Sequence, residues 1–234
     1  MTARELHKRI QALGDRERAE AAARFFKTGP GASGEGLRFL GLDAATLRAL
    51  AKEFRALPLA AIQNTLQSAW HDERGVALLI LTLQFPKADA PGQKKIYDLY
   101  LANTARINSW ALVDCSAPHI VGAYLFARSR KPLEKLAKSK SLWERRIAMV
   151  ATQHFLRKND FDATFRIAKL LLEDDEDLIH KAVGWMLREV GDRHQGLLEQ
   201  FLREHYHRMP RTMLRYAIEK FGEKKRKAYL AGTM

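Results

Sequence analysis

The sequence predicts an all-α protein, and three observations support this prediction. Apolar residues recur every three or four positions, which matches the 3.6-residue period of a helix. No long segment shows the period of two that is typical of a half-buried strand. The breaks between the periodic segments are short, so that from Leu42 onward helices of roughly 12–16 residues follow one another.

The expected helices can be placed in chain order by their apolar stripes and by the residues that begin them. The stripes are Leu47, Leu50, Ala51 and Phe54; Val76, Leu79, Ile80 and Leu83; Ile147, Val150, Ala151 and Phe155; and Phe165, Ala168, Leu171 and Leu172. Three more helices are expected over Leu178–Val190, Leu197–Tyr206 and Arg211–Phe221. Prolines that fit helix starts are Pro58, Pro86, Pro91, Pro132 and Pro210, and the expected N-caps are Asp43, Asp72, Ser141, Asp160 and Asp192.

Pairs of these helices recur about every 40 residues, which suggests tandem HEAT-like repeats, an α-α solenoid. Such a superhelical stack has a concave face that accepts a rod as wide as DNA. Periodicity leaves a compact helical bundle open as the alternative. We expect one domain over residues 1–234, in which residues 1–40 form an N-terminal helix and a glycine-rich loop packed on the solenoid. The loop, Thr28–Gly36, is interpreted as a linker, with a mobile flap as the alternative.

The charge balance indicates a polyanionic partner. The chain has 40 Lys and Arg against 27 Asp and Glu, a net charge of +13. This excess favours nucleic acid or an acidic membrane surface, while a merely basic protein is the alternative. We therefore expect a basic concave face that binds DNA.

Other features exclude several classes of site. The only cysteine, Cys115, excludes a disulfide framework and a cysteine-rich metal site. Metalloprotease, P-loop and dinucleotide-binding motifs are absent, so we expect neither a metal nor a cofactor. No apolar stretch is long enough to cross a bilayer, and the first residues are polar. We expect a cytoplasmic protein without a membrane partner.

The segment from Ile107 to Pro118 is the first candidate site. Trp110 and Asp114 are four residues apart and share a face on a helix. Pro118 cannot donate a hydrogen bond to the carbonyl of residue 114, so the helix must bend or stop there. Either outcome holds the carboxylate at the mouth of a groove. The spacing also allows Trp110 to be a core residue, with Asp114 or Ser116 capping the next helix.

A second candidate site follows Ser141, which forms a predicted capping box with Glu144. The core stripe through Ile147 cannot hold both Arg145 and Arg146, so at least one is expected to reach solvent or phosphate. A guanidinium suits phosphate because its planar fork donates two hydrogen bonds at once.

The third candidate site combines Trp185 with Arg188, which are neighbours on a helix surface. Gly184 beside them costs about 1 kcal/mol relative to alanine in a helix interior. This cost is expected where something packs closely against the helix, either a ligand or another helix.

At these three segments the sequence resembles the AlkD family of bacterial alkylpurine DNA glycosylases. The strongest match runs from Asn108-Ser109-Trp110 through Val113-Asp114 to Ser116-Ala117-Pro118. Trp143–Arg146 and Gly184–Glu189 follow in the family's order and at about its spacing. The resemblance covers most of the chain, from Phe39-Leu40-Gly41-Leu42 to Arg211–Ala217, but gives no role to the glycine-rich loop.

The resemblance implies a fold, an activity and site residues. The family folds as tandem HEAT-like repeats and excises cationic purines of the 3-methyladenine and 7-methylguanine type from double-stranded DNA. It hydrolyses the N-glycosidic bond and contacts the backbone and sugar of the lesion without flipping the base into a pocket. Residue by residue, Asp114 corresponds to the catalytic carboxylate, and Trp110 and Trp185 to active-site tryptophans. The DNA-contacting arginines of the family correspond to Arg146 and Arg188. Arg145 is included because the match to the family at this position allows either Arg145 or Arg146.

Two other functions remain as alternatives. A non-catalytic HEAT-repeat protein could bind distorted duplexes through the same basic face, and a protein-interaction scaffold would need neither the tryptophans nor Asp114. Salt dependence separates the scaffold, because phosphate binding weakens steeply as salt rises. We expect a monomer, since one chain that wraps one duplex needs no second copy.

Overall fold

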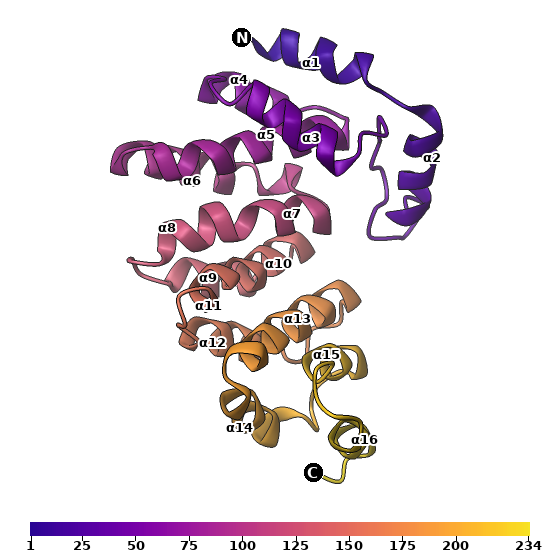
Figure 1. Cartoon of the computed structure of the whole chain (residues 1–234), viewed down its shortest axis with the longest axis vertical. Coiled ribbons are helices and arrows are strands. Elements are labelled where there is room, and N and C mark those ends of the chain that lie inside the picture. Colours follow the sequence, from indigo (N-terminus) through magenta and orange to yellow (C-terminus); the bar gives the residue numbers. More distant parts are fainter. The chain divides into compact units, whose positions relative to one another are not determined.

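The computed structural model describes residues 1–234 and consists of helices joined by short connections (Figure 1). It contains no strand, only an isolated bridge between Arg38 and Trp70. The all-α prediction is therefore confirmed. The chain forms two compact units, Met1–Ile120 and Val121–Met234.

The first unit holds seven α-helices. They are α1 (Ala3–Ala12), α2 (Arg16–Phe25), α3 (Ala44–Glu53), α4 (Leu59–Leu66), α5 (His71–Gln84), α6 (Ala90–Ala102) and α7 (Trp110–Ala117), with 3₁₀ turns at Phe85–Lys87 and Thr104–Arg106. Helix α5 is central, because α1, α3, α4 and α7 all pack against it. A helix covered from several sides is expected to be buried around most of its circumference, as α5 is.

The first turn of α5 carries four consecutive polar residues, His71, Asp72, Glu73 and Arg74, and all four are buried. We call this group the α5 anchor. Each member binds a different segment. His71 Nε2 lies 2.8 Å from Ser109 Oγ, and Asp72 accepts hydrogen bonds from the backbone N–H groups of Leu40 and Leu42. Glu73 contacts the side chains of His7 and Gln11, and Arg74 donates hydrogen bonds to Ser68, Ala69 and Asn108. Leaving one such buried group without its partner costs about 1–3 kcal/mol or more, so the anchor fixes the surrounding segments.

Two helices, rather than one, precede the glycine-rich loop. Helix α2 has no buried residue and is held at its beginning, where Asp15 N–H donates to the Leu40 carbonyl at 2.8 Å. The backbone approaches so closely here that a Cβ on Gly41 would lie 2.1 Å from the Asp15 carbonyl oxygen. Gly41 also has φ +85°, a conformation that favours glycine.

Some of the expected N-caps are correct and others are wrong. Asp43 caps α3, and Ser141 caps α10 (Leu142–Ala151), as predicted. Asp72 instead lies inside the first turn of α5, and Asp160 binds the Arg130 guanidinium. Asp192 lies within α13 (Asp177–Arg193), which continues past it. Each carboxylate has the residue type of a cap, but tertiary partners or a longer helix determine its place.

The second unit begins within a π-helical turn, Pro118–Gly122, that continues from α7. Pro118 therefore ends regular α-helix beside Asp114, as predicted, through a widened turn. The later helices are α8 (Ala123–Leu125), α9 (Lys131–Ala137), α10 (Leu142–Ala151), α11 (Gln153–Leu156), α12 (Asp162–Leu170), α13 (Asp177–Arg193), α14 (Gln195–His205), α15 (Arg211–Ala217) and α16 (Glu223–Ala231). Helix α13 is central in this unit, with α10, α12, α14 and α15 packed against it.

Close packing between α13 and α15 explains the glycine in the middle of α13. A Cβ on Gly184 would lie 2.4 Å from Tyr216 Cβ and 2.5 Å from the Met213 carbonyl oxygen. The expectation of close packing at Gly184 is confirmed, and the packing partner is another helix.

We predict that Gly184→Ala destabilises the protein although alanine is the better helix former. The clash with the backbone of α15 outweighs the gain in helix propensity, for a net loss of about 1–2 kcal/mol in the free energy of unfolding by urea. Gly196→Ala is the control, because a Cβ there meets only the His194 ring, at 3.5 Å. The control should be more stable by about 0.5 kcal/mol. A Gly184→Ala protein as stable as the wild type would contradict the packing argument.

Candidate active site

Helix α7 presents the two residues of the first candidate site. Ser109 caps the helix by accepting the Leu112 N–H at 3.2 Å, so Trp110 is its first residue and Asp114 follows one turn later. Both side chains are half-buried, and neither Asp114 nor Ser116 caps a following helix. The alternative in which these residues serve as caps is therefore wrong.

Hydrogen bonds hold α7 at both ends. At its beginning, the cap residue Ser109 is buried and bonded to His71 of the α5 anchor. Near its end, Ser116 Oγ donates to the Leu112 carbonyl and lies 3.0 Å from the hydroxyl of Tyr100, which is fully buried. This support fixes the helix that carries Asp114.

Aromatic side chains surround Trp110. The Phe26 ring stacks on the Trp110 indole, with centroids 5.0 Å apart and an interplanar angle of 12°, and Phe25 meets it edge-on at 5.7 Å. Phe39 and His71 extend the cluster behind Phe26. A cavity of about 490 Å³ opens among these rings, and 68% of Phe25 is exposed.

The sequence pattern did not predict this aromatic wall, which consists of the Phe25, Phe26 and Phe39 rings. Phe25 and Phe26 directly precede the glycine-rich loop, and the pair of aromatic residues at a helix end was the available signal. Phe39 lies in the segment Phe39-Leu40-Gly41-Leu42, which carries part of the family resemblance but no signal of an aromatic contact. Contacts across more than 80 residues bring the Phe25 and Phe26 rings to Trp110, and sequence spacing carries no information about such contacts.

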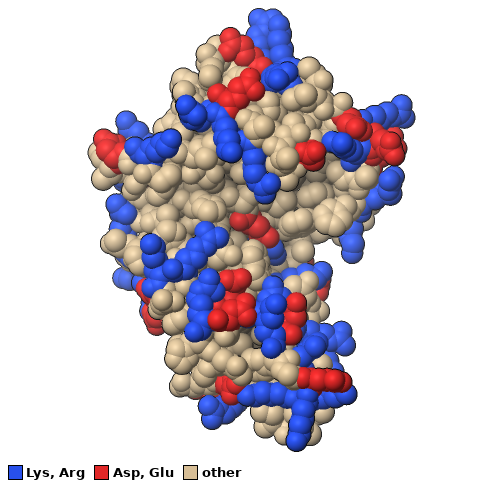
Figure 2. Space-filling model, in the orientation of Figure 1, with Lys and Arg blue, Asp and Glu red and all other residues tan.

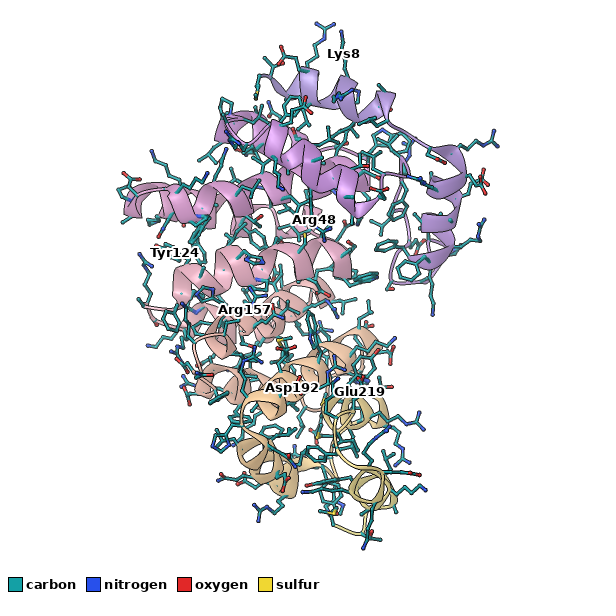
Figure 3. The ribbon with its side chains drawn as sticks, in the orientation of Figure 1. Lys8, Arg48, Tyr124, Arg157, Asp192 and Glu219 are labelled. Carbon is teal, nitrogen blue, oxygen red and sulfur yellow. The ribbon has the colours of Figure 1, made fainter.

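Burial and neighbouring charges both act on the pKa of the Cys115 thiol on α7. Burial and then the nearby Asp114 carboxylate raise the pKa of Cys115 to about 12, so this cysteine is a poor nucleophile. The Arg48 guanidinium opposes that rise, which indicates that its positive charge lies near the same turn of α7. Figure 3 shows Arg48, an exposed residue of α3, between α3 and α7.

In the second unit, the two arginines of α10 are both tied to the protein. Arg145 binds the Asp174 carboxylate through Nε at 2.6 Å, and it donates to the carbonyls of Ser139 and Lys140. Arg146 is only 5% exposed and donates to the Leu178 carbonyl. Neither arginine extends freely into solvent, because each donates hydrogen bonds to neighbouring groups of the protein. The expected contact of one of them with phosphate stays a prediction.

The residues of α13 also have partners within the protein. Trp185 is half-buried, and its Nε1 donates to Glu189 at 3.3 Å. Arg188 pairs with Glu219 after α15, and 20% of its side chain is exposed. Figure 3 labels Glu219 beside α15.

The structure thus divides the predicted site residues between the two compact units. Trp110 and Asp114 lie together on α7 of the first unit. Arg145 and Arg146 lie on α10, and Trp185 and Arg188 on α13, with α10 packed against α13 in the second unit.

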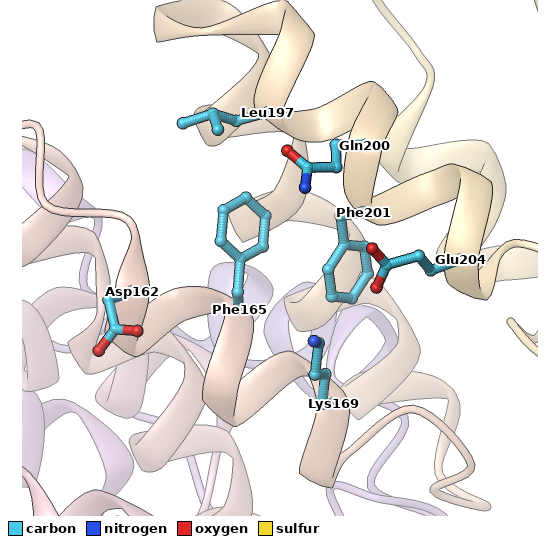
Figure 4. A pocket seen from close by; sticks show the side chains of 7 residues that line it. All are labelled: Asp162, Phe165, Lys169, Leu197, Gln200, Phe201 and Glu204. Carbon is cyan, nitrogen blue, oxygen red and sulfur yellow. The ribbon is translucent and has the colours of Figure 1, made fainter.

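Four further features of the molecule bear on its function. No group of three or more His, Cys, Asp or Glu side chains could hold a metal ion, and no helix is long and apolar enough to span a membrane. Basic side chains outnumber acidic ones on the face seen in Figure 2. A separate cavity of about 320 Å³ lies between α12 and α14, where Phe165 stacks on Phe201 (Figure 4).

We predict that His71 makes stability depend on pH. Burial, and to a lesser degree the Arg74 guanidinium, lowers the pKa of His71 from 6.5 to about 3. The folded protein therefore keeps this imidazole neutral, and the stabilisation is present above pH 6.5 and lost as the pH falls towards 3. Between pH 7.5 and 5 this one group lowers the free energy of unfolding by about 2 kcal/mol.

Urea unfolding of the wild type and of His71→Gln at both pH values measures this effect. The variant cannot take up the proton, so its stability should fall by about 2 kcal/mol less over the same interval. Parallel loss of stability in the two proteins would contradict the assignment of a neutral His71.

Comparisons with known proteins place the chain in a family. The sequence model of a family described as DNA alkylation repair enzyme matches residues 6–221. The comparison with curated proteins finds no match. Two solved structures share the fold: a predicted DNA alkylation repair enzyme from Enterococcus faecalis (TM-score 0.68, 16% identity, covering 90% of this chain and 97% of that chain) and AlkD2 from Streptococcus mutans (TM-score 0.56, 17% identity, 94% and 97%).

At these identities the solved structures show the fold alone, and they confirm the predicted all-α helical repeats. The family match rests on the sequence and spans almost the whole chain. This chain belongs to the DNA alkylation repair enzyme family, the AlkD family that its sequence resembles.

Proposed function

We propose that this protein is a DNA glycosylase that removes cationic N3- and N7-alkylated purines from duplex DNA. The observation that carries the proposal is the arrangement on α7. Trp110 lines an aromatic cavity, and a half-buried carboxylate, Asp114, follows one turn later on the same helix. Membership of the DNA alkylation repair enzyme family supports a repair substrate of this kind.

The proposed reaction needs only a carboxylate, water and an already weakened bond. Alkylation at N3 or N7 gives the purine a positive charge, and the departing base takes the electrons of the glycosidic bond and becomes neutral. Positive charge then develops on the deoxyribose, as in glycoside hydrolysis. An ionised Asp114 stabilises this charge and orients the water that adds to the sugar carbon, and the water's proton is released. The reaction uses no metal or cofactor.

The tryptophans are proposed to hold the cationic nucleotide. An indole face attracts a cation by about 0.5–2 kcal/mol, depending on how far the pair is removed from water. Phe26 already covers one face of Trp110, so a ligand is restricted to the other face or to the ring edge. Trp185 is proposed as the second aromatic contact, by its correspondence with the family.

The arginines are proposed to bind DNA phosphates by exchanging partners. Arg188 is paired with Glu219, Arg145 is paired with Asp174, and Arg146 donates to a backbone carbonyl. The pair with Glu219 is the easiest to replace, because 53% of the Glu219 side chain is exposed and such ion pairs contribute little. Arg145 has four of its N–H donors engaged, so it is the least available of the three.

We further propose that the base is not flipped into an enclosing pocket, by correspondence with the family. Without an enclosing pocket, nothing measures the outer edge of the base, so alkyl groups of different size are tolerated. Selection then depends on the charge of the lesion and on its quality as a leaving group.

We predict that Asp114→Asn abolishes base release and preserves DNA binding. Removing a group that stabilises transition-state charge lowers a rate about 100- to 1,000-fold, whereas the neutral amide keeps the shape of the site. Release of 7-methylguanine and 3-methyladenine from methylated duplex DNA measures the first effect, and fluorescence anisotropy measures the second.

Asp98→Asn is the matched control, because Asp98 is an exposed carboxylate on α6 that pairs with Lys94. The control should release bases at the wild-type rate. No release by the wild type, together with salt-sensitive duplex binding, would refute the glycosylase proposal and favour a non-catalytic DNA-binding protein.

We also predict that Glu219→Gln strengthens binding to duplex DNA. The substitution frees Arg188 from an ion pair worth about 0.5–1 kcal/mol, which corresponds to an affinity about two to five times higher. In a background of Arg188→Gln the same substitution should have almost no effect. Glu223→Gln, which removes an equal charge from an exposed pair with Lys227, controls for net charge. Equal gains in both backgrounds would exclude Arg188 as the source.

A further inference from the structure

A run of basic residues surrounds α9 of the second unit. Residues 128–140 contain six basic side chains and one acidic side chain, Glu134. Glu134 is bound to Arg166 at 3.1 Å, and Arg130 is bound to Asp160. The five basic residues that remain are exposed: Arg128, Lys131, Lys135, Lys138 and Lys140.

Three of these residues form one line on α9. Lys131, Lys135 and Lys138 are spaced by four and three residues, so they share one face of the helix and of the turn that caps it. We call them the α9 stripe. The apolar side chains Leu133 and Ala137 are buried, where α9 packs against α10 and α12. The stripe therefore occupies the exposed side of a helix whose apolar side is already covered.

The α9 stripe differs from three other helical lysines of this chain. Lys94, Lys181 and Lys227 are each bound by an acidic residue one turn away, namely Asp98, Asp177 and Glu223. On α9 the only acidic residue within one turn of Lys131 and Lys138 is Glu134, and it is bound to Arg166 instead. Lys131 and Lys135 are like charges at a spacing that destabilises a helix. No ion pair involves any of the three lysines of the stripe. This arrangement is unfavourable in the isolated protein and becomes favourable beside a polyanion.

We propose that the α9 stripe binds the phosphate backbone of duplex DNA, independently of any lesion. The proposal rests on the proposed function in that DNA is the substrate. The stripe extends about 10 Å along the helix, and a duplex carries one negative charge for about every 1.7 Å of its length. Lysine is a flexible point charge, which suits contacts that carry no sequence information. The stripe holds the protein on undamaged DNA while it searches for lesions.

The chemistry of α9 favours DNA over an acidic membrane surface. A helix that lies on a membrane inserts an exposed apolar face beside its basic face. In α9 that apolar face, with Leu133 and Ala137, is buried in the protein. Only charge is left to bind a partner, and a dense line of phosphates supplies the opposite charge.

The test compares the full-length wild type with a triple variant, Lys131→Gln, Lys135→Gln and Lys138→Gln. Binding to a short undamaged duplex is measured by fluorescence anisotropy at increasing KCl. Losing three phosphate contacts should reduce the slope of log affinity against log salt by about 2.7. Between 50 and 200 mM KCl, the affinity of the wild type should therefore fall about 40-fold more than that of the variant.

A second triple variant, Lys8→Gln, Lys87→Gln and Lys95→Gln, is the matched control. These lysines are also exposed and their loss changes the net charge equally, but they do not form a line on one helix. The control should keep a slope within about 1 of the wild type. Thermal unfolding should show both variants folded, and the stripe variant no less stable than the wild type, because its like-charge repulsion is gone.

Two further measurements separate this proposal from its alternatives. Base release from methylated duplex DNA by the wild type is measured in parallel. If the wild type releases no base but the slopes still differ, the glycosylase proposal fails and the α9 stripe stands. Equal slopes for the stripe and control variants would refute the proposal that the α9 stripe binds DNA. The proposal would also be refuted if the stripe lysines were needed for binding to phosphatidylglycerol vesicles but not for binding to the duplex.

Discussion

The buried polar turn at the start of α5 is the constraint on which the first unit depends. Four consecutive side chains that normally lie on a surface are enclosed here, and each has a partner in a different segment. A buried charge without its partner is far more costly than an exposed one, so the segments cannot move independently of α5. The hydrophobic effect drives burial in general, whereas these directed hydrogen bonds determine which segment lies where.

The candidate catalytic carboxylate receives its position from this constraint. His71 of the α5 anchor holds Ser109, Ser109 caps α7, and α7 carries Asp114. Widening of the helix at Pro118 then ends the regular hydrogen bonding one turn beyond the carboxylate. The residues proposed to do chemistry are thus placed by a rigid support, while α2, which brings the aromatic rings to Trp110, has no buried residue. The rigid support positions the carboxylate tightly. The aromatic wall is held by fewer buried contacts, so it is compatible with access for a large substrate.

Electrostatics divides the basic residues of this chain into two kinds. Those on α10 and α13 are matched by carboxylates or carbonyls of the protein, which keeps them oriented and requires an exchange of partners before they can bind phosphate. Those of the α9 stripe have no such partner and are free to meet a polyanion at any place along it. Oriented arginines suit contacts at a defined position on the DNA, and unpaired lysines suit phosphate contacts at any position along it. The net charge of +13 therefore combines groups with different proposed roles.

The sequence by itself determined the all-α class, the positions of most helices, the pairing of Trp110 with Asp114 on one helix face, and the family. These features follow from residues close together in the chain, where a 3.6-residue period or a proline has a direct local effect. Only the tertiary structure determined the partners of Asp72, Asp160 and Arg146, because each is buried or bound by residues about 30 positions away in the chain. The aromatic wall was hidden for the same reason, since Phe26 reaches Trp110 across 84 residues of chain. A polar or aromatic residue type indicates what contacts are possible, and burial against distant segments decides which of them form.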